Sequence, residues 1–486
     1  MVLAPASSYG YLLPEIIVAI AGGLLIVVDL IWPAYDADTQ TSRTWPAYLG
    51  IVSLLAAGAS LVPIAGVTAT LFSGIIQIDP FAAFFKFLFI GIGAFAMLMS
   101  ANAVPRFTRW TAEFYALILW TILGSMLLAS AAELFTIFLS LQLTSLPLVA
   151  LIAWGKRDPR SGEAALKYLL LVLVSTAVLL YGMSLIYGSL GTSTLSEIAV
   201  ALAGVKTVQP VLAMGLVLLL TGFAFKITAA PFHYWVPDVY EGAPTPVTAF
   251  MSVGSKFAGF ALAMRVIVAA EKVPLNWHLI FGVMAAISMT LGNLGAIRQV
   301  NIKRMLAYSG IAQAGYLLVG VAAFSEMGIS SLLFYTLAYG AANLAAFAVV
   351  LVIANSTGSE LIKDYSGLSR RNPVLALALT VALLSLAGLP LMAGFMAKFY
   401  VFLSAAQAGL VWLVAIGVIN SVISVYYYLH VALVMFVSES SEGPVRVDRP
   451  ATLSLAVLTM VVLVLGIVPD TAMVAAQRAA AALFRG

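Results

Sequence analysis

Apolar segments of about 20 residues recur from one end of the chain to the other, separated by short stretches rich in Gly, Pro and charged residues. A segment of that length can cross the hydrocarbon core of a bilayer as an α-helix. The pattern predicts an all-α polytopic membrane protein with fourteen transmembrane helices. We place them near residues 12–32, 45–65, 80–102, 111–130, 131–153, 163–188, 208–229, 244–270, 277–297, 304–324, 328–355, 373–407, 409–436 and 452–470. Residues 68–79 alternate around Ser73–Gly74 and predict a short surface hairpin.

Composition strengthens this interpretation and excludes several others. The chain is 63% hydrophobic and 9% charged, whereas soluble domains carry roughly a quarter charged residues. It has no cysteine, which excludes disulfides, thiolate ligands and iron–sulfur clusters, and its three histidines do not share a metal-ligand spacing. We therefore expect no cofactor and no metal in this chain. Basic clusters interleaved with aromatics are also missing, so nucleic acid is not an expected partner.

Basic residues between the predicted spans give an orientation. Loops after odd-numbered spans hold 14 Lys and Arg residues, whereas the other loops and both termini hold four. The positive-inside rule then puts the loops after odd-numbered spans in the cytoplasm and both termini on the outer side, and we expect the protein to lie in the inner membrane. No Lys or Arg precedes Arg43, so the first span lacks the basic region of a signal peptide and we expect it to be retained.

The remaining six basic residues fall inside spans: Lys86, Lys167, Lys226, Lys256, Arg265 and Lys398. A charge at the centre of a membrane helix costs roughly 2.5–3.5 kcal/mol on insertion scales. A snorkelling anchor or a structural ion pair explains Lys86, Lys167 or Arg265 alone as well as a function does. Three lysines in separate interior helices, with Glu133 the expected acid at depth, favour an array that hands protons across the membrane.

Two helices are predicted to break beside these lysines. Pro231 follows Lys226 by five residues, and Gly388 and Pro390 precede Lys398. Proline removes a backbone donor, and the freed carbonyls are tolerated at membrane depth only beside protein or water. Interrupted helices at matching places in two halves indicate an inverted repeat with its site at the breaks. We divide the single transmembrane domain into residues 1–110, a first five-helix repeat at 111–270, a second at 277–436, and a last helix with the C-terminus at 452–486.

The segment from Phe225 to Phe250, together with Val253–Lys256, Asn301–Ser309 and Gly388–Lys398, resembles the signature of the proton-antiporter-like membrane subunits of complex I and of multisubunit sodium/proton antiporters. Within that family, Pro237–Gly242 is similar to the N-type branch, the counterpart of mitochondrial subunit 2. The resemblance covers nearly the whole chain. It implies a subunit that couples electron transfer from NADH to quinone with proton pumping.

The resemblance also implies roles for individual residues. Glu133 would pair with Lys226, Lys256 would relay protons to Lys398, and His233 would lie in the link between helices 7 and 8. Lys167 resembles a further lysine on the proton-entry side. Flavin, iron–sulfur clusters and quinone chemistry would belong to other subunits, and the implied partners in the bilayer are L-, M- and K-type neighbours.

Three other functions compete with this one. A subunit of a monovalent cation/proton antiporter or a membrane-bound hydrogenase would need the same lysines, and only the Asp238–Gly242 variant favours complex I. A structural spacer that had lost pumping would be expected to lose its buried charges, which are present. A carrier of organic solutes would need specificity groups that the proton interpretation leaves unexplained, and we find none.

Overall fold

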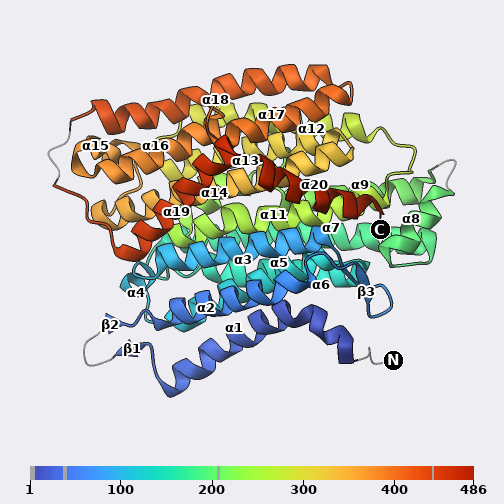
Figure 1. Cartoon of the computed structure of the whole chain (residues 1–486), viewed down its shortest axis with the longest axis horizontal. Coiled ribbons are helices and arrows are strands. Elements are labelled where there is room, and N and C mark those ends of the chain that lie inside the picture. Colours follow the sequence, from blue (N-terminus) through green and yellow to red (C-terminus); the bar gives the residue numbers. More distant parts are fainter. Residues whose placement is uncertain (1–5, 37–40, 205–207, 440–442, 486) are drawn as a thin grey trace.

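The computed structural model describes residues 6–36, 41–204, 208–439 and 443–485. These residues form a helical bundle with two short antiparallel hairpins, and the helices lie roughly side by side along one direction (Figure 1). Twelve of the described helices are long and apolar enough to cross a membrane: α1 (Leu13–Ile31), α2 (Trp45–Leu61), α3 (Pro80–Ser100), α5 (Thr111–Ser130), α6 (Leu134–Ile152), α7 (Pro159–Leu190), α11 (Thr245–Ala269), α12 (Trp277–Ile297), α13 (Ile302–Ala322), α14 (Glu326–Thr357), α18 (Val411–Val437) and α19 (Arg449–Ile467).

Two further crossings are each made of two short helices. α9 (Pro210–Lys226) is followed by α10 (Trp235–Gly242), and α16 (Pro373–Ala387) is followed by α17 (Ala393–Gln407). With each interrupted pair counted once, the described residues make fourteen crossings, as predicted. The predicted breaks of helices 7 and 12 are confirmed, because neither pair is a continuous helix. The first interruption begins directly after Lys226, before Pro231 is reached.

The order of the crossings agrees with two five-helix groups. α5, α6, α7, α9/α10 and α11 form the first, and α12, α13, α14, α16/α17 and α18 form the second; the fourth crossing is the interrupted one in both groups. Five crossings carry the chain from one end of the bundle to the other. The second group therefore starts at the end opposite to the first, and its helices run in the opposite direction. The predicted boundaries near 111–270 and 277–436 fall at ends of these helices, and the division remains our interpretation.

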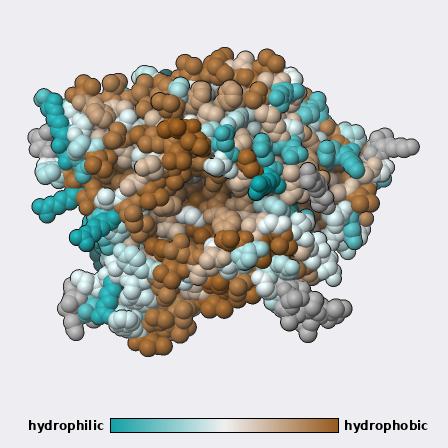
Figure 2. All heavy atoms as spheres, in the orientation of Figure 1, coloured by the Kyte–Doolittle hydropathy of each residue, from teal (hydrophilic) through white to brown (hydrophobic). Residues whose placement is uncertain are grey.

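The two ends of the bundle differ in charge. We call the end at the left of Figure 1 the basic end; it carries α4 (Val104–Phe107), α15 (Leu368–Arg371) and the hairpin β1 (Tyr35–Asp36) with β2 (Thr41–Ser42). The opposite end carries the hairpin β3 (Ala69–Leu71) with β4 (Ile76–Ile78), the short helix α8 (Leu195–Ala203) and both termini (Figure 1). Figure 2 shows hydrophilic residues protruding at the basic end and hydrophobic ones along the flanks.

Polar side chains that lie deep in this bundle are shielded by α11, α13 and α14, which are almost wholly buried. α14 is the central helix and packs against α11, α13, α16, α17, α19 and α20 (Asp470–Arg485). The predicted hairpin at residues 68–79 is confirmed by the pairing of β3 with β4. α8, α20 and the β1–β2 hairpin were not predicted, because they are too short or too polar to give a span-length apolar signal.

Candidate functional site: three buried lysines at interrupted helices

The first break places Lys226 at the last position of α9, with its side chain 6% exposed. Its Nζ donates to the hydroxyl of Ser145 on α6, 2.7 Å away. The turn that follows has Thr228 at φ 62°, a left-handed backbone that β-branched residues rarely adopt. The backbone N–H of Ala230 donates to Ser288 of α12, so a hydroxyl from the second group satisfies a donor released by the break.

Glu133 does not pair with Lys226, so this part of the prediction is wrong. Glu133 precedes α6 at the opposite end of the bundle and caps that helix by accepting from the backbone N–H of Thr136 at 2.8 Å. Ser145, which binds Lys226, lies nine residues beyond Thr136, or about 13 Å along the helix axis. The hydropathy profile located a span boundary near residue 131, but it could not separate a capping carboxylate from one facing the interior.

The surroundings of Glu133 explain why a carboxylate is stable there. Burial raises the pKa of this carboxyl group, but hydrogen bonds from the backbone N–H groups of Phe135 and Thr136 and from Ser193 outweigh burial and lower it. Glu133 also forms a β-bridge with Thr194, in the segment that leads into α8. These contacts give Glu133 a structural role at the surface of the opposite end.

Lys256 lies in the middle of α11 and is 1% exposed. Its Nζ donates to the carbonyl oxygen of Gly310 on α13 at 2.7 Å and contacts the hydroxyl of Tyr339 on α14 at 3.4 Å. A side chain on residue 310 would meet the ammonium, since an added Cβ would lie 3.0 Å from Nζ. Glycine at this position therefore gives the lysine direct access to a backbone carbonyl.

The second break holds Lys398 in a different way. Its Nζ donates to the carbonyl oxygen of Ala387, the last residue of α16, at 2.8 Å. Gly388 follows in the left-handed region at φ 88°, which frees that carbonyl from the helix. The ammonium also lies 4.4 Å from the ring centre of Tyr316 on α13, within the range of a cation–π contact.

His233 lies in the first break, between α9 and α10, and its ring stacks on Tyr234. The Nδ1 atom is buried and has no hydrogen-bond partner among the described residues. The predicted place was the link between helices 7 and 8, whereas the structure puts His233 within the interruption of helix 7. A ring nitrogen without a hydrogen-bond partner suits a group that takes up or releases a proton. Within the described residues no cluster of His, Asp or Glu side chains could hold a metal ion.

At the basic end, Lys167 belongs to a network of ion pairs around α10. Lys167 donates to Asp238 at 2.8 Å, and Arg304 at the start of α13 binds Asp238 and Glu241. A cavity of about 230 Å³ opens between these groups. The network ties α10 of the first group to α13 of the second, and it places charged and water-accessible groups on this side of the first break.

The other two basic residues within spans form buried ion pairs. Lys86 binds Glu15 of α1 at 2.6 Å, and Arg265 binds Asp79, the residue that caps α3, at 2.8 Å. Arg265 also donates to the carbonyl oxygen of Ala129. The structural alternative considered for these two residues is therefore confirmed: Lys86 joins α3 to α1, and Arg265 joins α11 to α3 and α5.

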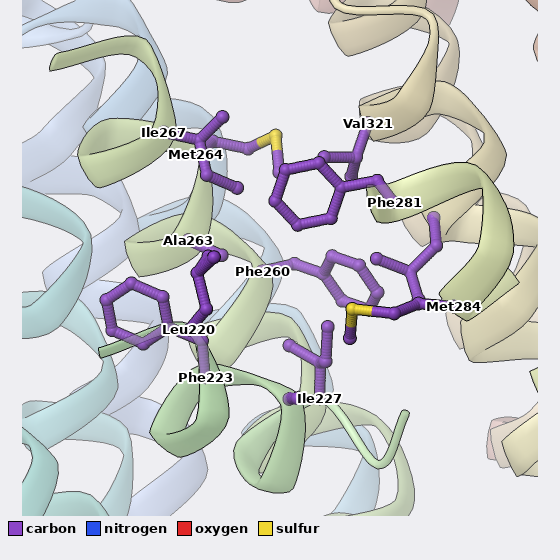
Figure 3. Close-up of a pocket in the computed structure, with 12 residues that line it drawn as sticks. Leu220, Phe223, Ile227, Phe260, Ala263, Met264, Ile267, Phe281, Met284 and Val321 are labelled. Atoms are coloured by element: carbon purple, nitrogen blue, oxygen red, sulfur yellow. The ribbon is translucent and has the colours of Figure 1, made fainter. Parts of the chain in front are cut away.

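Towards the opposite end, the first break is covered by apolar side chains. Figure 3 shows Ile227, Phe260, Phe281 and Met284 pointing toward one another. The space that these and the neighbouring side chains enclose has a volume of about 10 Å³. That volume is at the lower limit for one water molecule, and every residue lining it is apolar. We call this set the apolar cluster: Leu220, Phe223, Ala224, Ile227, Phe260, Ala263, Met264, Ile267, Phe281, Met284, Leu318 and Val321.

The second group differs, because a polar cavity of about 370 Å³ lies at the opposite end, beside the last turn of α17. His278, Ser325, Ser404 and Gln407 line this cavity together with apolar residues. Ser404 lies six residues beyond Lys398 on α17, which is about 9 Å along the helix axis. The first group thus has a charged cavity at the basic end and an apolar cluster towards the opposite end, whereas the second group has a polar cavity at the opposite end. Neither polar cavity is lined by Lys226, Lys256 or Lys398.

Comparisons with known proteins agree with this architecture. Residues 131–424 match the family model described as NADH:quinone oxidoreductase/Mrp antiporter, TM. The chain belongs to this family. It is 43% identical over 473 residues to NADH-quinone oxidoreductase subunit N of Trichlorobacter lovleyi, with 96% of each chain covered.

Solved structures show the same family fold. A chain of respiratory complex I from Thermus thermophilus superposes with a TM-score of 0.80 at 32% identity, over 95% of this chain and 98% of that one. A chain of the Mrp complex from Dietzia sp. has a TM-score of 0.87 at 21% identity, over 98% of both chains. At that identity the second likeness concerns the fold alone.

Proposed function

We propose that this chain is a proton-translocating, antiporter-like membrane subunit of a respiratory NADH:quinone oxidoreductase. The observation that carries the proposal is the presence of three buried lysines in separate helices, two of them at interrupted helices, without an ion pair among the described residues. A charged cavity at the basic end of the first group and a polar cavity at the opposite end of the second suit entry and exit of protons. Protons would enter near Lys167, load Lys226 beside the first break, pass to Lys256 and Lys398, and leave through the cavity lined by Ser404.

The groups that bind the three lysines suit side chains that release their protons, rather than side chains that stay charged. Lys226, Lys256 and Lys398 are bound by a hydroxyl or a backbone carbonyl, and none forms an ion pair within the described residues. A carboxylate partner would hold the charge on a buried ammonium, whereas a neutral acceptor leaves the lysine able to release its proton. His233 in the first break is the further candidate for taking up a proton.

Redox chemistry belongs to other subunits in this proposal. The Trichlorobacter lovleyi relative carries the name of a NADH-quinone oxidoreductase subunit, and its similarity extends over almost the whole chain. We therefore propose neighbouring L-, M- and K-type membrane subunits as partners, and we place flavin and iron–sulfur clusters outside this chain. The similarity to the Mrp complex does not favour an antiporter, because it is confined to the fold.

The experiment that tests the proposal is Lys256→Met in membranes that contain the assembled complex. Methionine keeps the length and the apolar stem of lysine but cannot carry a proton. We expect proton pumping to fall strongly while the complex still assembles. Pumping at the wild-type rate by an assembled Lys256→Met complex would contradict the proposal, and pumping that depends on sodium instead of protons would favour the antiporter.

We further propose that the basic end faces the cytoplasm and that the protein lies in the inner membrane with both termini outside. The support is the excess of 14 basic residues over four in the two sets of loops. Reporter domains fused near Arg157 and near Gly204 should report the cytoplasm and the exterior, respectively. The reverse result would show that the proposed direction of transport through the bundle is wrong.

A further inference from the structure

A buried polar cluster fills the space between the sites of Lys256 and Lys398. Ser309 of α13 and Tyr428 of α18 share a hydrogen bond between their hydroxyl groups. Gln313, one turn further along α13, donates from Nε2 to the Tyr428 hydroxyl at 3.4 Å and accepts from the hydroxyl of Tyr335. All four side chains are at most 2% exposed, so their hydrogen bonds are made to protein groups and not at a solvated surface.

Gln313 also reaches the second break. Its Nε2 donates to the carbonyl oxygen of Leu386 at 3.0 Å, and the next carbonyl in the chain, that of Ala387, accepts from Lys398. On the other side, Ser309 directly precedes Gly310, whose carbonyl accepts from Lys256. The acceptors of the two lysines are thus connected by one turn of α13 and a single side-chain hydrogen bond.

We propose that Gln313, together with Tyr428, is a positioning residue that couples the site of Lys256 to the site of Lys398. The inference rests on the proposed function. Gln313 holds the free end of α16 at a fixed place relative to α13, so a change at the Gly310 carbonyl is transmitted to the carbonyl that binds Lys398. An amide serves this purpose because it offers a donor and an acceptor at once, and both are used here.

A cluster of this kind has a stability role as well, since buried polar groups left unpaired are costly. The two roles are separated by measuring assembly and thermal stability beside pumping, and a substitution that restores the hydrogen bonds only when protonated shows whether these bonds are what pumping needs. In Gln313→Glu, a protonated carboxyl donates to Leu386 and accepts from Tyr335, whereas a carboxylate cannot donate. Two titratable groups contact this position, Tyr335 on α14 and Tyr428 on α18. Lys256 and Lys398 bind the nearby carbonyls of Gly310 and Ala387, and the other titratable groups of the cluster are Tyr316, Tyr339 and Tyr427.

The test compares proton pumping with electron transfer in membranes carrying the assembled complex, over a range of pH. We expect Gln313→Leu and Tyr428→Phe to slow pumping at least fivefold at every pH, because each removes more than one buried hydrogen bond and a single one corresponds to roughly fivefold. Gln313→Glu should recover towards wild type as pH falls. Tyr115→Phe is the matched control, because it removes a buried hydroxyl that is hydrogen-bonded to Ser100, on α5 and away from the lysines.

Two outcomes overturn the inference. Wild-type pumping by Gln313→Leu would show that the residue does not couple the sites, and a Gln313→Glu profile with no pH-dependent recovery would show that its hydrogen bonds are not what couples them. The proposed function has its own test in Lys256→Met. If that variant loses pumping while Gln313→Leu keeps it, the function stands and only the coupling role fails.

Discussion

Replacement of Lys226 by alanine is expected to abolish proton transfer through this subunit while the complex still assembles. Lys226 is buried beside the first break and binds the neutral hydroxyl of Ser145, so its removal leaves no opposite charge unpaired there. Loss of a positioned proton-transfer group commonly costs roughly 100-fold or more in rate. Lys226→Arg should not restore transfer, because a guanidinium group hardly loses its proton.

The matched control for this experiment is Glu133→Gln. The carboxylate of Glu133 caps α6 at the opposite end of the bundle and does not contact Lys226. We expect Glu133→Gln to lower thermal stability slightly, because a capping acceptor is weakened, and to leave pumping near wild type. Proton pumping and electron transfer should be measured together, with assembly checked by native electrophoresis. Full pumping by Lys226→Ala would remove this lysine from the pathway, and loss of pumping in Glu133→Gln would restore the predicted pair.

The sequence allowed the membrane architecture and the three lysines to be predicted because both depend on strong local signals. Long apolar segments, Pro231 and Gly388 are visible without any tertiary information. The structure confirms both interruptions and places Lys226, Lys256 and Lys398 in the interior.

The partners of these lysines could not be predicted from the sequence, since they come from helices far apart along the chain. Ser145, Gly310 and Ala387 carry no charge and give no local signal that they would bind an ammonium. The available signal for the polar cluster was the spacing of Ser309 and Gln313. Four residues apart, they put two polar side chains on one face of α13, within its mostly apolar middle part. Glu133 was misplaced for the opposite reason: its charge was conspicuous, but capping depends on the backbone of the turn before α6.

The second large effect is expected when the apolar cluster is made polar. This cluster separates the first break from the opposite end of the bundle (Figure 3). Its central space is at the lower size limit for one water molecule and offers no polar partner to bind one. Phe260 is fully buried there, one turn beyond Lys256 on α11. Phe260→Ser should open a void with a hydroxyl group at its edge, which water can occupy.

Water in that void would connect the Lys226 and Lys256 sites with the opposite end and bypass Lys398. We expect Phe260→Ser to collapse a preformed pH gradient several-fold faster than wild type, in vesicles where no electron transfer takes place. Phe260→Leu is the matched control, because it also leaves a void but keeps the lining apolar and dry. Since a truncated core phenylalanine costs roughly 3–5 kcal/mol, Met284→Gln provides a second polar variant of nearly unchanged volume. If both polar variants hold the gradient as long as the wild type, the apolar cluster is not the barrier, and the seal against proton leak must lie elsewhere along α9 and α11.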